Sequence, residues 1–301
     1  MKTVLILIKR NTKLFFKDKG MLITALITPL ILLVLYATFL AKVFKDSFAG
    51  GMPPGIEIAP ELLDGCVGGQ LCSSLLAVCC VTVAFCANLL MVQDKVTGAR
   101  RDFNVSPVDP AKLAVSYYVA TLLVTLVICL VACSACFVYM AAVGWYLSAA
   151  DVLWLLLDVF LLSMFGTALS SVISFGLSTQ GQISAVGTVI SAGYGFICGA
   201  YMPISSFAEG LQKVLSFLPG TYGTVLLRRH ALRGVFESME ADGIPTQAVD
   251  GLRAAVDARV KFFGHEVEAP VMYLVLGGTV AVLMLAYIVM NACGKKALKK
   301  Q

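Results

Sequence analysis

Residues 113–143 read LAVSYYVATLLVTLVICLVACSACFVYMAAV, a continuous stretch that contains no charged residue. About 20 mostly apolar residues in a helix cross the hydrocarbon core of a bilayer, so this stretch is long enough to span a membrane. The whole chain shares its apolar character: 59% of its 301 residues are hydrophobic and 14% are charged. Soluble proteins carry about 25% charged residues. The composition therefore predicts an integral membrane protein.

Five further apolar stretches bring the number of predicted spans to six. The first covers residues 20–41 and contains Pro29, where we expect a kink. The others cover residues 69–92, 152–177, 183–202 and 271–293. The sequence thus predicts an all-α polytopic membrane protein in which residues 1–301 form a single transmembrane domain. Within it, residues 20–202 hold spans one to five, and residues 294–301 form a basic tail.

The distribution of lysine and arginine between the connections indicates which way the chain faces. With the N-terminus inside, the inner segments are residues 1–19, 93–112, 178–182 and 294–301. They hold fourteen basic and four acidic residues, whereas the outer segments hold nine basic and thirteen acidic residues. We therefore expect both termini on the cytoplasmic side.

The segment before the first span, residues 1–19, combines apolar and basic residues. An amphipathic helix of this kind lies in the membrane interface, with its lysines on anionic headgroups. We therefore predict an interfacial helix with Lys9, Arg10, Phe15 and Lys17 among its membrane-facing residues. A cytoplasmic extension of the first span remains the alternative.

The outer segment, residues 203–270, is too apolar for a solvated loop. It begins at Pro203, has an amphipathic run over residues 207–217 and a break at Pro219–Gly220, and then reads as helix over residues 222–235 and 248–263. A re-entrant helical pair that dips into the outer leaflet fits this pattern, since irregular backbone at membrane depth needs protein or water around it. A small extracellular cap of amphipathic helices is the alternative.

Motifs for autonomous chemistry are absent from the sequence. It contains no G-x-x-x-x-G-K-[S/T], H-E-x-x-H or G-x-S-x-G, so it lacks a P-loop for ATP and the common hydrolase signatures. The net charge of +5 has no dense basic block outside the termini, which argues against nucleic acid as a partner. With only two histidines, the sequence predicts no metal site and no cofactor.

Polar and small residues within the spans give weaker signals. Asp158 either lies inside the fourth span or, if that span begins at Val159, at the outer interface. We expect no buried ion pair. Most of the ten cysteines lie in apolar runs, where cysteine serves for packing. A disulfide between Cys66 and Cys72 remains open. The pair Gly195 and Gly199 suggests close packing of an interior helix.

Four segments, taken in order, carry a resemblance to a known family. They are RNTKLFFKDKGMLITALITPLILLVLYATFL (10–40), DKVTGARRDFNVSPVDPAKLAVSYY (94–118), YMPISSFAEGLQKVLSFLPGTYGTVLLRRHALRG (201–234) and the final GKKALKKQ. Their order and spacing resemble the permease subunit of the type-2 ABC exporter family over essentially the whole chain. One departure is that the family often has a glutamate where Val96 or Gly98 stands.

The resemblance implies that two permease subunits, identical or related, pair with two copies of a separate ABC ATPase subunit in the plasma membrane, most often of a bacterium. It implies that the ATPase docks on the inner connection after the second span, at Asp94, Lys95, Gly98, Arg100, Arg101, Asp102 and Phe103. It also implies an outer gate that includes Pro203, Phe207, Leu211, Leu218 and Tyr222. The exported substrate would be amphipathic or lipophilic: a drug, an antibiotic, a lipid or a lipid-linked glycan.

A self-sufficient secondary transporter or channel is the alternative function. Internal inverted repeats would support it, but residues 1–145 and 146–301 differ in loop sizes and motif order. An intramembrane enzyme would need clustered polar groups within the spans, and the sequence offers only Asp158.

Overall fold

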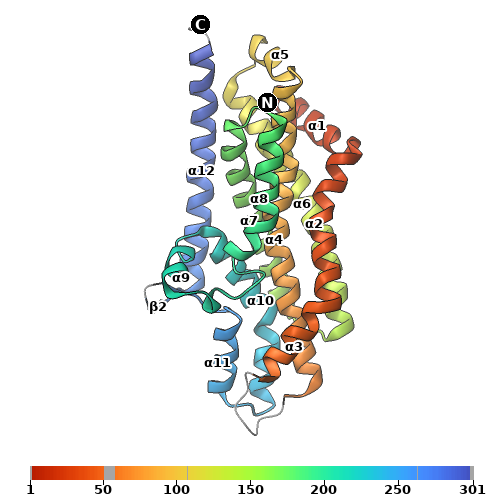
Figure 1. Ribbon diagram of the computed structural model, residues 1–301, viewed down its shortest axis with the longest axis vertical. Helices are drawn as coiled ribbons and strands as arrows, with labels where there is room; N and C mark the ends of the chain where they lie inside the picture. The colour runs from red at the N-terminus through yellow and green to blue at the C-terminus, as the bar shows by residue number, and fades with distance from the viewer. Residues whose placement is uncertain (1, 51–57, 107, 263, 299–301) are drawn as a thin grey trace.

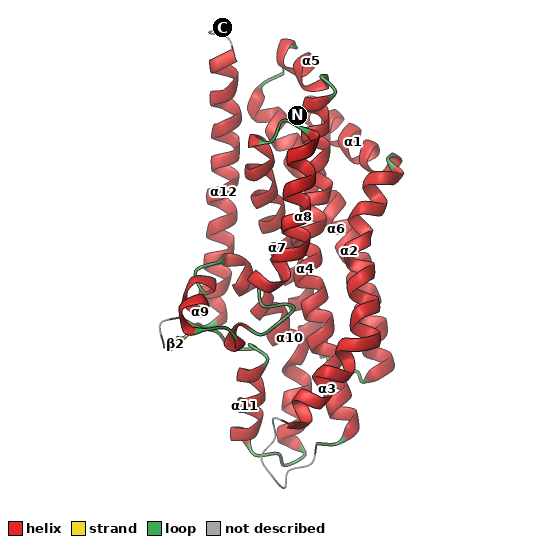
Figure 2. Ribbon diagram, viewed as in Figure 1, coloured by secondary structure: helices red, strands yellow, loops and turns green. Residues whose placement is uncertain are grey.

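The computed structural model describes residues 2–50, 58–106, 108–262 and 264–298. Within these ranges the chain is helical, apart from loops and one short hairpin, Lys261–Phe262 (β1) with His265–Glu266 (β2) (Figure 2). The start of α1 (Lys2–Lys17), the end of α12 (Ala269–Leu298) and α5 (Ala99–Val105) lie at one end of the elongated bundle, here named the terminal end (Figure 1). Helices α3 (Ala41–Gly50) and α11 (Thr246–Ala255) lie at the opposite end, here named the far end.

Five of the described helical segments are long and apolar enough to cross a membrane. Four of them are α4 (Pro60–Val96), α6 (Pro110–Val143), α7 (Ala149–Gly176) and α12 (Ala269–Leu298). The fifth runs from α2 (Lys19–Leu35) through a π-helical turn, Tyr36–Leu40, into α3. Two helices complete the bundle, α8 (Gln180–Ile197) and α10 (Pro219–Ala241). This architecture confirms an all-α polytopic membrane protein.

Local sequence signals account for where these helices begin. Asp18 accepts a hydrogen bond from the Met21 amide at the start of α2, and Asp109 does the same for α6, whose first residue is proline. Ser148 and Asp151 form a reciprocal capping box at the start of α7. In each cap a side-chain oxygen accepts a hydrogen bond from a backbone amide that would have no partner in the bilayer interior.

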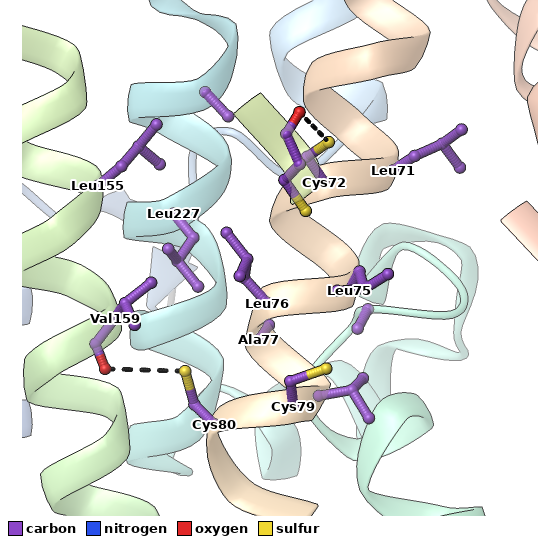
Figure 3. Packing of buried hydrophobic residues seen from close by; sticks show 14 of the residues in the cluster. Leu71, Cys72, Leu75, Leu76, Ala77, Cys79, Cys80, Leu155, Val159 and Leu227 are labelled. Carbon is purple, nitrogen blue, oxygen red and sulfur yellow. Dashed lines mark hydrogen bonds between the residues drawn. The ribbon is translucent and has the colours of Figure 1, made fainter. Parts of the chain in front are cut away.

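Helix α4 is the centre of the bundle and is buried along almost its whole length. Helices α2, α6, α7, α8 and α10 all pack on it. Its cysteines, alanines and glycines permit this close approach. The Cys80 thiol donates to the Val159 carbonyl of α7 and the Cys72 thiol to the Cys136 carbonyl of α6, at 3.7 and 3.6 Å (Figure 3).

Nine of the ten cysteines are buried, as the packing prediction requires, whereas Cys293, which was also predicted to pack, is exposed. Cys129, Cys133 and Cys136 are all buried on the side of α6 that joins the core. Cys66 and Cys72, for which a disulfide was left open, are free and buried within one helix.

The contact between α7 and α4 depends on Gly166. A Cβ at this position would lie 2.7 Å from the Cys80 carbonyl oxygen and 2.9 Å from the Val81 Cα, both backbone atoms. Replacing Gly166 by alanine is therefore expected to destabilise the fold by about 1–3 kcal/mol through overpacking. Gly278, in α12 with nothing within 4 Å, is the matched control, and alanine there should be neutral or stabilising. Equilibrium unfolding in mixed micelles measures both, and equal stability of the two variants would disprove this packing role.

Several element predictions need correction. α1 (Lys2–Lys17) is a helix separate from the first span, so the extension alternative is wrong. The helices in residues 203–270 are α9 (Glu209–Leu215), α10 and α11. Helix α10 starts at Pro219, and α11 ends at Ala255, after which the hairpin follows. Helix α8 is not interior, because only Ile183, Tyr194 and Gly195 are buried on it. A Cβ on Gly195 would meet the Tyr201 ring, and Gly199 has φ +75°, so both glycines permit the chain reversal after α8.

Candidate coupling site

Residues 94–105, from the last turn of α4 to the end of α5, form a compact elbow at the terminal end of the bundle. Gly98, with φ +86°, ends α4 in the left-handed conformation that glycine adopts without strain. The short helix α5 begins at the next residue. The seven residues predicted to couple the chain to an ATPase all lie in this elbow, but the structure divides them into an inner and an outer group.

Asp94 belongs to the inner group and is almost fully buried, at 5% exposure. The Arg10 guanidinium from α1 donates to both of its carboxylate oxygens, at 2.7 and 3.0 Å, and the Tyr117 hydroxyl from α6 donates at 2.5 Å. These hydrogen bonds raise the pKa of Arg10 above its ordinary value. Asp94 therefore connects three helices and is not available to a partner.

Lys95 binds the end of α7. Its ammonium donates to the backbone carbonyls of Ser174, Phe175 and Leu177 at 3.1, 2.6 and 2.8 Å. The Ser174 carbonyl also accepts from the Leu177 amide, whereas carbonyls at the end of a helix generally lack a partner within it. A cation at a helix C-terminus is also favoured by the helix dipole. The lysine therefore fixes the elbow to α7.

Two residues of α5, Arg100 and Phe103, complete the inner group. Arg100 donates to the Asn291 side chain of α12 at 2.7 Å and lies over the Tyr117 ring, 5.4 Å from its centroid. Phe103 receives the Arg10 guanidinium over its ring at 5.1 Å. A displacement of α5 would therefore act directly on α1, α6 and α12.

Arg101 and Asp102 form the outer group. Both side chains are exposed, and neither has a hydrogen bond or ion pair among the described residues. Val105, at the end of α5, is 87% exposed. Of the predicted residues, Arg101 and Asp102 are thus the ones presented for a partner.

The sequence analysis missed Tyr117 and Asn291 as parts of this site. A tyrosine and an asparagine inside otherwise apolar spans were the available signal, because buried polar groups need partners. Which partner each would find depends on the packing of helices far apart in the sequence.

The four residues predicted to face the membrane on α1 fall into an exposed pair and a pair that packs on the bundle. Lys9 and Lys17 are exposed, as membrane-facing residues would be. Arg10 and Phe15 are not on the outer face. Arg10 binds Asp94, and Phe15 is 1% exposed because α1 buries Leu7, Asn11 and Phe15, spaced four residues apart, against the bundle. The prediction that Arg10 and Phe15 face the membrane was therefore wrong, because both pack on the bundle.

The predicted gate residues lie at or near the turn that contains α9. Leu211 is 44% exposed, and Pro203, Phe207 and Leu218 are half-buried. Tyr222 is buried, and its hydroxyl donates to the Ser216 carbonyl at 2.7 Å, which closes the turn between α9 and α10. The structure therefore brings four residues to this surface and assigns Tyr222 to its interior.

Behind this turn lies a buried arginine that sequence reasoning missed. Arg228 of α10, 1% exposed, donates to the Val256 and Gly199 carbonyls at 2.6 and 2.8 Å and to the Ser74 hydroxyl of α4 at 3.3 Å. Asp257 lies 3.9 Å from it and accepts from the Ile204 and Ser205 amides. Burial raises the pKa of Asp257, while the charge of Arg228 opposes that shift.

Asp158 forms a second buried polar cluster. It is 1% exposed, and its carboxylate contacts the His230 ring nitrogen of α10 and the Tyr273 hydroxyl of α12, both at 2.6 Å. Trp154 stacks on His230, with ring centroids 5.6 Å apart. The expectation of no buried ion pair was wrong for Arg228 and Asp257. The partners of Asp158 were missed because they come from two other helices far apart in the sequence.

Comparison with known proteins identifies the family. No curated protein matches the chain. The family model described as ABC-2 type transporter matches residues 2–230, which include α1, the elbow and the turn that contains α9. Members of this family typically work with an ABC ATPase. The chain therefore belongs to the ABC-2 type transporter family as its multi-pass membrane component.

Proposed function

We propose that the chain is the membrane-spanning permease subunit of an ATP-driven exporter, and that a separate ABC ATPase hydrolyses the ATP. The observation that carries the proposal is the elbow, which exposes Arg101 and Asp102 while Asp94, Lys95 and Arg100 connect it to four other helices. A polar outer surface on a rigidly connected element suits an interface that transmits motion. The family match over residues 2–230 supports this role.

In this proposal the chain has six spans, with α8 as the fifth, and its terminal end faces the cytoplasm of a bacterial cell. The excess of basic residues in the segments at this end supports the orientation. Helices α9 and α10 would then lie on the outer side as the re-entrant pair, with Pro203, Phe207, Leu211 and Leu218 in the gate. Tyr222 would hold that gate's turn in shape through its bond to Ser216.

The translocation path is proposed to run along a groove between α2 and α8. The groove has a volume of about 680 Å³ and is floored by Cys86 and Leu89 of α4. Its α2 side is mostly apolar, with Ile27 and Ile31, whereas its α8 side offers Ser184 and Thr188. Such a mixed lining suits an amphipathic or lipophilic substrate: a drug, an antibiotic, a lipid or a lipid-linked glycan. A second permease subunit, identical or related, would close the open side of the groove over the exposed face of α8.

The docking part of the proposal is tested by Arg101→Glu. Charge reversal at this exposed residue should abolish transport-coupled ATPase activity, since like charges across an interface cost several kcal/mol. The chain should remain folded, because Arg101 supports no neighbouring helix. Lys112→Glu, exposed at the start of α6, is the matched control. Normal coupled activity in Arg101→Glu would refute the docking assignment.

The energy source is tested separately with the purified chain. We expect it neither to bind nor to hydrolyse ATP, and to move no substrate in liposomes until an ABC ATPase is added. A gradient-driven flux from the chain alone would instead support a self-sufficient transporter. The Asp158–His230–Tyr273 cluster is the observation that favours this second candidate, because buried ionisable groups mark proton pathways in such proteins.

A further inference from the structure

A second groove lies between α2–α3 and α6 at the far-end half of the bundle. Both sides of the groove pack on α4, which forms its floor. It consists of two adjoining cavities, of about 250 and 520 Å³, that share Tyr139 and Ala142 of α6. Their combined size is in the range of small-molecule sites, which is about 300–1,000 Å³. Part of the chain's surface thus has room for a ligand outside the α2–α8 path.

The smaller cavity is apolar. Leu33 and Tyr36 line it from one side, Leu75 from the floor and Ala135 and Val138 from α6. Leu33 is 42% exposed and Val138 71% exposed, so the cavity opens on a surface that apolar side chains present to the surroundings. The π-helical turn begins at Tyr36, and such turns are frequent at functional sites. An aliphatic chain from the bilayer matches this cavity.

The larger cavity has a lining of mixed polarity and lies toward the far end. It is lined by Thr38, Lys42, Lys45 and Asp64. Lys45 forms an ion pair with Asp64 at 2.6 Å, whereas the exposed Lys42 has no ion pair among the described residues. Asp46, one turn beyond Lys42 on α3, is not within ion-pair distance of it. The lining therefore carries one uncompensated positive charge.

The position of the two cavities along the helices agrees with where the surface of the bilayer is expected. The uncharged run that begins in α2 continues through the π-helical turn to Ala41, and Lys42 and Lys45 are the first charged residues after it. Trp145, 47% exposed, follows the end of α6 at the same end of the bundle, and tryptophan concentrates at the membrane–water interface. The lysines are therefore at headgroup depth and the apolar cavity is at acyl-chain depth.

We infer that this groove binds an anionic phospholipid of the bilayer. One acyl chain occupies the apolar cavity, and the headgroup phosphate lies at Lys42, with the Lys45 ammonium beside it. An apolar cavity that continues into a positively charged one at the interface has the shape and charge of such an amphiphile. The site lies on the opposite side of α2 from Thr24, Ile27 and Ile31, which line the proposed path.

The test uses the purified chain in nanodiscs of phosphatidylcholine with graded phosphatidylglycerol, and native mass spectrometry counts the retained lipid. We expect one retained phosphatidylglycerol. Lys42→Gln should weaken its retention about five-fold, the contribution of one lysine at an anionic surface, and should remove its preference over phosphatidylcholine. Lys112→Gln, an exposed lysine at the terminal end, should leave retention unchanged.

A second pair of variants tests the chain cavity without changing charge. Ala142 is exposed and lines both cavities, whereas its exposed neighbour Ala141 lines neither. In Ala142→Phe the added ring should fill the groove and exclude part of the lipid's acyl chain, which should lower phosphatidylglycerol retention about ten-fold. Ala141→Phe should retain phosphatidylglycerol as the unmodified chain does. Equal retention by both, or no preference for phosphatidylglycerol in the unmodified chain, would overturn the inference. Because no ATPase is present, this outcome is independent of the proposed transport function.

Discussion

Replacing Arg10 by alanine is expected to destabilise the protein by about 2–4 kcal/mol and to uncouple ATP hydrolysis from transport. The substitution leaves the Asp94 carboxylate buried with the Tyr117 hydroxyl as its remaining partner. Removing one partner of a buried ion pair costs about 3–5 kcal/mol. The expected value is lower because the Arg10 side chain is 30% exposed and water replaces part of the lost interaction.

Equilibrium unfolding in mixed micelles measures this effect, with the exposed neighbour Lys9→Ala as its control. Arg10→Lys should recover only part of the stability, because an ammonium does not reproduce the two-bond guanidinium contact. The double variant Arg10→Ala with Asp94→Asn should lose less than the sum of the single variants. If Arg10→Ala is as stable as Lys9→Ala, the elbow does not depend on this contact.

Replacing Arg228 by methionine is the second large effect that we expect. Methionine fills much of the volume, but it leaves the Val256 and Gly199 carbonyls without their donor and Asp257 without its nearest positive charge. We expect a loss of about 3–5 kcal/mol, the range for breaking a buried ion pair by removing one partner. The turn that contains α9 should loosen first, because these hydrogen bonds connect α10 to the residues that follow α8 and α11.

The adjacent Arg229→Met supplies the control, since Arg229 is exposed and a surface substitution should change stability by less than about 0.5 kcal/mol. Arg228→Met combined with Asp257→Asn should regain part of the loss, because the second change removes the unpaired buried charge. Equilibrium unfolding in micelles measures the change in stability, and proteolysis at the turn that contains α9 measures how far that turn loosens. Equal stability of the Arg228 and Arg229 variants would contradict the structural role of Arg228.

Five of the six predicted spans match described helices that are long and apolar enough to cross a membrane, and they were predictable because each depends on local composition. The remaining prediction, residues 183–202, corresponds to α8, which is not among those five helices. The long apolar run at residues 113–143 became α6 within three residues of its predicted ends. The helix α8 shows the limit of this reasoning. Its glycines suggested an interior helix, yet they serve a chain reversal, and most of its surface is exposed. Composition alone does not distinguish a glycine that permits helix packing from one that ends a helix.

The candidate site was predictable in position but not in its internal roles. Charge and proline signals located the elbow, yet its seven residues looked equivalent in sequence. Asp94 is engaged within the chain, unlike Asp102, because Arg10 and Tyr117 donate hydrogen bonds to it. These two residues lie 84 residues before Asp94 and 23 residues after it along the chain. The buried partners of Asp158 and Arg228 were missed for the same reason, since they come from helices brought together by packing.

The most direct test of the proposed coupling is a photo-crosslinking residue placed at position 101 in the full chain in cells. Crosslinked partners would be identified by mass spectrometry, with Trp145 at the far end as the control position. We predict a crosslink from position 101 to a protein that carries an ATP-binding P-loop, and none from position 145. An ATPase crosslinked from position 145 but not from position 101 would contradict both the docking surface and the orientation of the chain.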